Sequence, residues 1–189
     1  MITANSLSDL TPIAFLQTFI IELMHASEQL GSQQSQQLIE HIALTAGCFF
    51  EEVYRTEHGN KKENLNIESY IELILGLKTN IGGNFSLSTS NQESIAVYNS
   101  RCPFGEKVVN SPELCMMTSS VFGGIAARNF GYAKVEIAKS IARQDGCCEV
   151  YIHLNPETAK SKPGVEYRDN KNDAKSEQTF AALQTRIEE

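Results

Sequence analysis

The chain has 189 residues, of which 41% are hydrophobic and 21% are charged, a composition typical of a soluble globular protein. Its formal net charge of −7 gives no general attraction to nucleic acid or to an acidic membrane, and no basic run supplies a local one. The longest apolar stretch, IAFLQTFIIELM, is broken by Gln17, Thr18 and Glu22 and is too short to cross a bilayer. No secretory signal is visible, so we expect a cytoplasmic protein that contacts neither nucleic acid directly nor a membrane.

Three helices are predicted in the first 80 residues. Residues 11–30 begin with a Thr-Pro pair, in which the hydroxyl caps the helix and proline takes the first helical position, and they end before a glycine. Residues 32–53 follow a serine cap and place apolar side chains at helical spacing. Residues 66–76 predict a shorter helix after an asparagine cap.

From residue 82 onward, alternation with a period of two replaces the helical pattern. Residues 82–100 predict a β-hairpin that turns at Ser-Asn-Gln, and residues 132–142 and 147–154 predict a second strand pair joined across Asp-Gly. Between them, residues 111–129 open with Ser-Pro and have a helical pattern closed by a glycine. We therefore predict an α+β fold, with N-terminal helices packed on an antiparallel sheet of about four strands, built from two β-hairpins with a helix between them.

The domain organisation follows from a change in composition. Residues 1–155 are expected to form a single α+β domain. Residues 156–189 are polar, of mixed charge and poor in large apolar side chains, so burial cannot offset the entropy lost on ordering them. We expect a flexible polar tail there.

Five cysteines, an odd number, are present, and in a reducing compartment clustered cysteines indicate metal binding, redox chemistry or burial more often than disulfides. Cys102, Cys115, Cys147 and Cys148 lie at a predicted strand exit, a helix start and a hairpin turn, which can converge at one end of a sheet. Cys48 lies in mid-helix and is expected to fill the core. No C-x-x-C pair is present, and a single cysteine is more often a packing residue than a ligand, so both interpretations stay open.

The local settings of these cysteines favour different chemistry. Cys115 should lie near the end of the first turn of its helix, where the dipole lowers the pKa of a thiol, although Glu113 acts in the opposite direction. In the last strand, Cys148 shares the apolar face and Cys147 the polar face, which makes Cys148 the better candidate for burial and Cys147 the more exposed residue. A cluster beneath the sheet would use the core-side thiol, so the choice between them stays open.

Residues 99–154 carry the motifs CPFG, PELC, GGIAARNFGYAKV and SIARQDGCCEV, and with them this segment closely resembles the methanogen output domain family. Members of that family are small modules often attached to prokaryotic signal-transduction proteins. Residues 16–84 match it only loosely, in the order of their elements. More distantly, the arrangement is similar to the 4-vinyl reductase domain, an α+β sensory module that in some regulators has a cysteine-rich zinc site beside an apolar ligand pocket. The cysteine pattern is also similar to the C-terminal part of iron–sulfur-sensing winged-helix repressors.

These resemblances imply a single sensory or output-type domain whose metal or cluster ligands are Cys102, Cys115 and one or both of Cys147 and Cys148. The adjacent pair departs from the related patterns, which place one cysteine after the hairpin glycine. Three or four thiolates suit an iron–sulfur cluster, whereas three with a carboxylate or an imidazole suit zinc. Candidate fourth ligands, each more often a surface residue, are Glu113, Glu149 and His153. We predict an iron–sulfur cluster, with zinc as the alternative.

The predicted function is that of a regulatory or sensory module, not an enzyme, which signals redox or metal state to another signalling protein. The apolar surface of the two N-terminal helices favours a homodimer. The alternative is a regulatory domain that binds a small apolar ligand and has a structural zinc or only buried cysteines. Its pocket would be lined by Phe49, Phe50, Tyr54, Ile71, Ile74, Phe122 and Phe130, although a filled core explains that spacing more readily. A thiol enzyme with Cys115 as nucleophile lacks a recognisable Cys–His signature.

Overall fold

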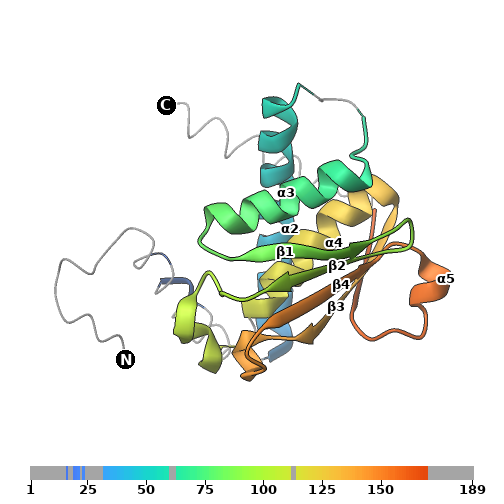
Figure 1. Ribbon diagram of the computed structural model, residues 1–189. Coiled ribbons are helices and arrows are strands. Elements are labelled where there is room, and N and C mark those ends of the chain that lie inside the picture. Colours follow the sequence, from blue (N-terminus) through green and yellow to red (C-terminus); the bar gives the residue numbers. More distant parts are fainter. Residues whose placement is uncertain are drawn as a thin grey trace.

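The computed structural model describes residues 16, 19–21, 23, 32–59, 63–111 and 114–169. Within these ranges, five antiparallel strands form one sheet in the order β1-β2-β4-β3-β5; helices α3 and α4 pack on it, and α2 packs behind α4 (Figure 1). The strands are β1 (Phe85–Ser90), β2 (Ser94–Asn99), β3 (Tyr132–Lys139), β4 (Cys148–His153) and β5 (Val165–Arg168). The helices are α2 (Ser32–Glu57), α3 (Ile67–Asn80), α4 (Leu114–Phe130) and the single turn α5 (Pro156–Ala159). The predicted α+β class is confirmed.

Local sequence signals account for several boundaries. Asn66 caps α3 by accepting the backbone amide of Ser69 at 2.8 Å, as its position predicted. In the β1–β2 hairpin, the side-chain oxygen of Asn91 accepts the amides of Glu93 and Ser94, which closes the predicted turn. Most of the predicted helix 11–30 lies outside the described residues, of which those at 16, 19–21 and 23 are helical. None of the helices in the described ranges combines the length and apolarity that a bilayer crossing requires.

The sheet has five strands rather than about four, and the additional strand lies in the predicted tail. β5 pairs with β3, and Tyr167 on β5 is 5% exposed, with its hydroxyl 2.9 Å from the Ser119 hydroxyl. The tail prediction averaged composition over the whole segment, whereas one buried tyrosine and one half-buried valine at alternating positions are enough to complete the sheet edge. A tail beginning at residue 156 is therefore wrong for residues 156–168, and residues 170–189 lie outside the described part of the chain.

Two adjacent glycines let α4 approach its neighbours on both sides. A Cβ added at Gly123 would overlap the ring of Tyr167 on β5, whereas one added at Gly124 would lie 2.6 Å from Cδ2 of Leu44 on α2. The glycine pair in the motif GGIAARNFG thus serves close packing, with Gly123 facing the sheet edge and Gly124 facing α2.

The substitution Gly123→Ala is expected to lower the free energy of unfolding by about 2–3 kcal/mol, because the aromatic ring of Tyr167 must move out of its buried position. Gly124→Ala is the matched control, with a smaller expected loss, because a terminal methyl group of Leu44 can rotate away. Urea unfolding measures both values, and hydrogen exchange of the β5 amides should accelerate only in Gly123→Ala. Equal losses in the two variants would contradict this account of the packing.

Candidate functional site: a thiol and amine cavity

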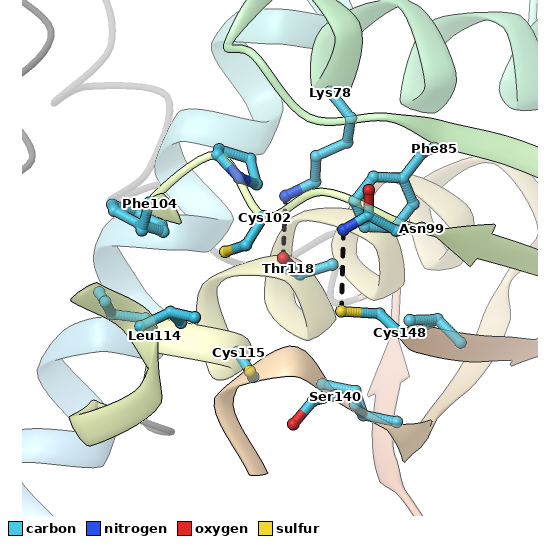
Figure 2. A pocket seen from close by; sticks show the side chains of 14 residues that line it. Lys78, Phe85, Asn99, Cys102, Phe104, Leu114, Cys115, Thr118, Ser140 and Cys148 are labelled. Carbon is cyan, nitrogen blue, oxygen red and sulfur yellow. Dashed lines mark hydrogen bonds between the residues drawn. The ribbon is translucent and has the colours of Figure 1, made fainter. Parts of the chain in front are cut away.

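A small cavity lies where β2 ends and β4 begins, beneath the C-terminal end of α3 (Figure 2). Its volume is about 40 Å³, which is room for one ion or a few water molecules. Most of its wall is apolar and comes from Phe85, Pro103, Phe104, Val108, Leu114, Ile137 and Val150. Three thiols and one amine also line this cavity, which we call the thiol cavity.

The three thiols are those of Cys102, Cys115 and Cys148, and each comes from a different element. Cys102 follows β2 and precedes the short 3₁₀ helix η2 (Gly105–Asn110), Cys115 lies in the first turn of α4, and Cys148 is the first residue of β4. Figure 2 shows their sulfur atoms around a common space. The predicted convergence at one end of the sheet is thus found for three of the four cysteines.

Polar contacts hold Cys148 in place. Its sulfur atom accepts the backbone amide of Ile141 at 3.5 Å and the side-chain amide of Asn99 at 3.7 Å. Ile141 begins the second 3₁₀ helix, η3 (Ile141–Arg143), which replaces the end of the strand predicted over residues 132–142. The side-chain oxygen of Asn99 in turn accepts the amides of Asn84 and Arg101, so one buried asparagine links the end of β2 to the thiol cavity.

The other two cysteines do not line the thiol cavity. Cys147 directly precedes β4, one residue from Cys148, and Cys48 lies in α2. Strand alternation predicted that Cys148 shares the core face, and its place beside Val150 in the cavity wall agrees with that prediction. Glu149 and His153, two candidate fourth ligands, instead pair with Lys139 at 2.9 Å and Glu136 at 3.4 Å, and Glu113 lies outside the described residues.

The amine in the thiol cavity is that of Lys78, which sequence reasoning did not single out. Lys78 lies in the last turn of α3, is only 7% exposed, and donates a hydrogen bond from Nζ to the hydroxyl of Thr118 at 2.8 Å. Its Nζ also lies 5.6 Å and 5.3 Å from the ring centroids of Phe85 and Phe122, where a cation is attracted to the aromatic faces. Burial lowers the pKa of Lys78 to about 8, while negative charge on the sulfur atoms of the three nearby cysteines, when they are deprotonated, acts to raise it.

Burial also determines the protonation of the thiols. It raises the pKa of Cys115 to about 11, against an opposing hydrogen bond with Ser140, and it raises the pKa of Cys102 as well. The effect of the helix dipole, which favoured a thiolate at Cys115, is therefore outweighed by desolvation. Both thiols are protonated at neutral pH when no metal ion is bound, so a metal that binds them must displace their protons.

The arrangement is not a preformed chelate. Among the described residues, no three His, Cys, Asp or Glu side chains stand close enough together to hold a metal ion. Binding at the thiol cavity therefore requires the three sulfur atoms to move toward one another. Of the three cysteines, Cys102 has the least regular backbone around it, since it lies between β2 and η2.

The residues predicted to line an apolar pocket do not line the thiol cavity. Ile74 and Phe122 are fully buried in the main hydrophobic core, which explains their helical spacing. Phe50 and Tyr54 pack partly against that core, and so do Ile71 and Phe130, whereas Phe49 on α2 is 39% exposed. Phe122 does reach the site from the core side, through its contact with the amine of Lys78.

The fold and the sequence each have a counterpart among known proteins. A trafficking protein particle complex subunit 3 from Naegleria fowleri, solved covalently bound to palmitic acid, is similar to this chain with a TM-score of 0.53 and 13% sequence identity. The similarity covers 76% of this chain and 95% of that one, and at this identity it concerns the fold alone. No curated protein sequence matches the chain. The model of methanogen output domain 1 matches residues 19–153, and because this match spans most of the sequence, the chain belongs to the methanogen output domain 1 family.

Proposed function

We propose that this protein is a regulatory module whose signal is the occupancy or the oxidation of the thiol cavity. The observation that carries the proposal is a buried lysine in the same small cavity as three cysteines. We assign it no catalytic step. The proposal also includes a cytoplasmic location, pairing with a second copy of the chain, and a separate signalling protein that receives the output.

Charge explains why an amine belongs beside these thiols. Three thiolates and one divalent ion leave one negative charge in excess, and the ammonium group of Lys78 neutralises it. A [4Fe–4S] cluster in its common oxidised form leaves the same excess on three thiolates. In a cavity of low dielectric such compensation is worth more than in water, because an uncompensated buried charge is costly. Among the described residues, the ammonium group contacts the Thr118 hydroxyl and two aromatic rings, and none of these groups is anionic.

The size of the cavity bears on which thiophilic group is bound. About 40 Å³ accommodates a single ion once the sulfur atoms converge, whereas an iron–sulfur cubane requires a larger opening between β2 and α4. We therefore rank a single thiophilic ion such as zinc above the iron–sulfur cluster that the sequence favoured. Such an ion would supply strong thiolate bonds that tie β2, α4 and β4 together.

The route of the signal follows from the elements that carry the ligands. Metal binding would draw together the residue before η2, the first turn of α4 and the first residue of β4. Since η2 and η3 also contact each other beside the cavity, loss of the metal would loosen this corner of the molecule as a unit. We propose that this corner is the surface read by the partner protein.

Metal content of protein purified under strict anaerobiosis tests the proposal. We expect stoichiometric zinc without colour, or iron and sulfide with broad absorbance near ~400 nm. Cys102→Ser, Cys115→Ser and Cys148→Ser should each lose most of the metal. Cys147→Ser is the matched control, because it removes the neighbouring thiol that does not line the cavity, and it should retain the metal.

Two results would overturn the proposal. One is a wild-type protein that stays metal-free after reconstitution with zinc or with iron and sulfide, and that shows no change in thiol reactivity on mild oxidation. The other is an equal loss of metal in Cys147→Ser and Cys148→Ser, which would place the site elsewhere.

The alternative function, binding of a small apolar ligand, has less support. The thiol cavity is apolar and contains thiols, and the structural neighbour from Naegleria fowleri carries a covalent palmitic acid. However, about 40 Å³ is far below the roughly 300–1,000 Å³ of typical small-molecule sites. An apolar ligand that fills a typical small-molecule site would first have to open the core around Phe85 and Val150.

A further inference from the structure

Helix α2 carries a row of apolar side chains that are partly exposed to solvent. Leu38, Ile42, Phe49 and Val53 are 42%, 44%, 39% and 42% exposed. At 3.6 residues per turn they fall within about 60° of arc, so they form one continuous stripe. The opposite side of α2 contains Ala43 and Gly47, which are buried, and Gly47 approaches the backbone of Val121 on α4.

The stripe is symmetric along the helix. The spacing along the sequence from Ala46 to Val53 equals the spacing from Leu38 to Thr45. The spacing from Ala46 to Phe49 likewise equals the spacing from Ile42 to Thr45. A two-fold axis between Thr45 and Ala46 therefore places Leu38 of one copy opposite Val53 of another, and Ile42 opposite Phe49. This is the pattern that an antiparallel, isologous pair of identical helices requires. We propose that α2 pairs with α2 of a second copy in this antiparallel arrangement.

The residues near the axis and beside the stripe fit the same arrangement. Thr45 and Ala46 are small, which permits close approach of the two helices, and the Thr45 hydroxyl already donates to the carbonyl of His41 at 2.9 Å. On one flank of the stripe, His41 and Glu52 are both exposed. Antiparallel pairing brings His41 of each copy beside Glu52 of the other, so complementary groups meet twice across the interface.

The exposed area sets the expected strength of association. The four side chains present roughly 300 Å² of apolar surface per copy, which is at the lower end of the range for the largest apolar patch on a monomer. A pair of helices of this length gives an interface at the lower end of the specific size range, so we expect a dissociation constant in the micromolar range.

Sedimentation velocity between ~1 and ~100 µM tests the association. The wild-type protein should convert from monomer to dimer over this range. Ile42→Glu should weaken the dimer by at least about 100-fold, because symmetry places two carboxylates in the apolar interface. Leu87→Glu is the matched control, since Leu87 is equally exposed at 42% but lies on β1, and it should dimerise like wild type. Phe49→Glu provides a second variant, and circular dichroism confirms that each remains folded.

Cross-linking tests the antiparallel geometry. In a Cys48→Ser background, a mixture of Leu38→Cys and Val53→Cys proteins should form a disulfide-linked heterodimer, whereas Leu38→Cys alone should not. A wild-type protein that is monomeric at ~100 µM, or a dimer unaffected by Ile42→Glu, would overturn the proposal. Self-cross-linking of Leu38→Cys would show a parallel pair, and absence of any heterodimer would exclude the stripe as the interface; both outcomes reject it. None of these results depends on whether the thiol cavity binds a metal.

Discussion

Replacement of Glu51 by alanine is expected to lower the free energy of unfolding by about 3–5 kcal/mol. The Glu51 side chain is 7% exposed and lies between α2 and the end of α4. One of its carboxylate oxygens accepts hydrogen bonds from Arg55 at 2.7 Å and from the side-chain amide of Asn129 at 2.8 Å. The other accepts from Nε of Arg128 at 2.9 Å. Removing the carboxylate leaves the partly buried guanidinium groups of Arg55 and Arg128 without the counter-charge that they share.

The network extends beyond these three partners, which is why the expected loss is large. Nη2 of Arg128 lies 2.8 Å from the Glu51 carboxylate, but the geometry is not that of a hydrogen bond, so this contact is an ion pair. The side-chain oxygen of Asn129 accepts the buried backbone amide of Leu65 and a second hydrogen bond from Arg55. Arg55 also donates to the carbonyl of Glu63. Glu51 thus holds the connection between α2 and α3 against the end of α4.

Urea unfolding of Glu51→Ala and of a control, Glu57→Ala, measures this effect. Glu57 is exposed at the end of the same helix, and its removal should change stability by less than about 0.5 kcal/mol. Glu51→Gln should fall between the two, because it keeps one hydrogen-bond acceptor but removes the charge. A loss below about 1 kcal/mol in Glu51→Ala would show that the network contributes little beyond a surface ion pair.

The burial of Glu51 and Lys78 was present in the helical pattern of the sequence, but their charge argued against it. Tyr70, Ile74 and Lys78 follow one another at helical spacing on α3, and all three are buried. Glu51 continues the line of Ala43 and Gly47 on α2 in the same way. Helical periodicity therefore placed both charged residues on the core side, but their side-chain chemistry favoured solvent. A charged residue in phase with a buried stripe is the signal that would have identified both networks.

The thiol site was predictable in position but not in chemistry. Strand alternation placed Cys148 on the core face, and the proline after Cys102 and the cap before Cys115 located the other two at element ends. The protonation of Cys115 was not predictable, because the helix dipole can be read from sequence, whereas desolvation depends on what packs above the thiol. β5 was missed for a related reason, since its burial depends on Gly123 making room for Tyr167.

In the metal-free, reduced protein, the free energy of unfolding of wild type relative to Lys78→Met is expected to rise by about 3 kcal/mol between about pH 8 and pH 10.5. The pKa of Lys78 is lowered from 10.5 to about 8 in the folded protein, so between these values the unfolded chain binds more protons than the folded one. The stability of wild type must therefore rise relative to the variant as pH increases from about 8 to 10.5, by about 1.4 kcal/mol for each pH unit of the shift. Below about pH 8, wild type carries the full cost of the buried ammonium group.

The raised pKa values of Cys102 and Cys115 act in the opposite direction, because folded thiols then retain protons that the unfolded chain releases. Their contribution lowers stability as pH rises above about 9, but it is present in both proteins and largely cancels in the difference. Urea unfolding at pH ~7 and ~10 measures that difference, with Lys160→Met, an exposed position, as the control that should not vary with pH. A difference that is the same at both pH values would show that Lys78 stays charged throughout.

The same variant separates stability from function. If the ammonium group compensates a thiolate-bound metal, Lys78→Met should be more stable than wild type at neutral pH but bind the metal about 10–100-fold more weakly. A buried lysine that only packed against Phe85 and Phe122 would not produce this combination, since its replacement by an apolar side chain of similar length would leave metal binding unchanged. Retention of a costly buried charge is expected where a site needs it, and the opposite signs of the two effects are what distinguish a functional lysine from a packing one.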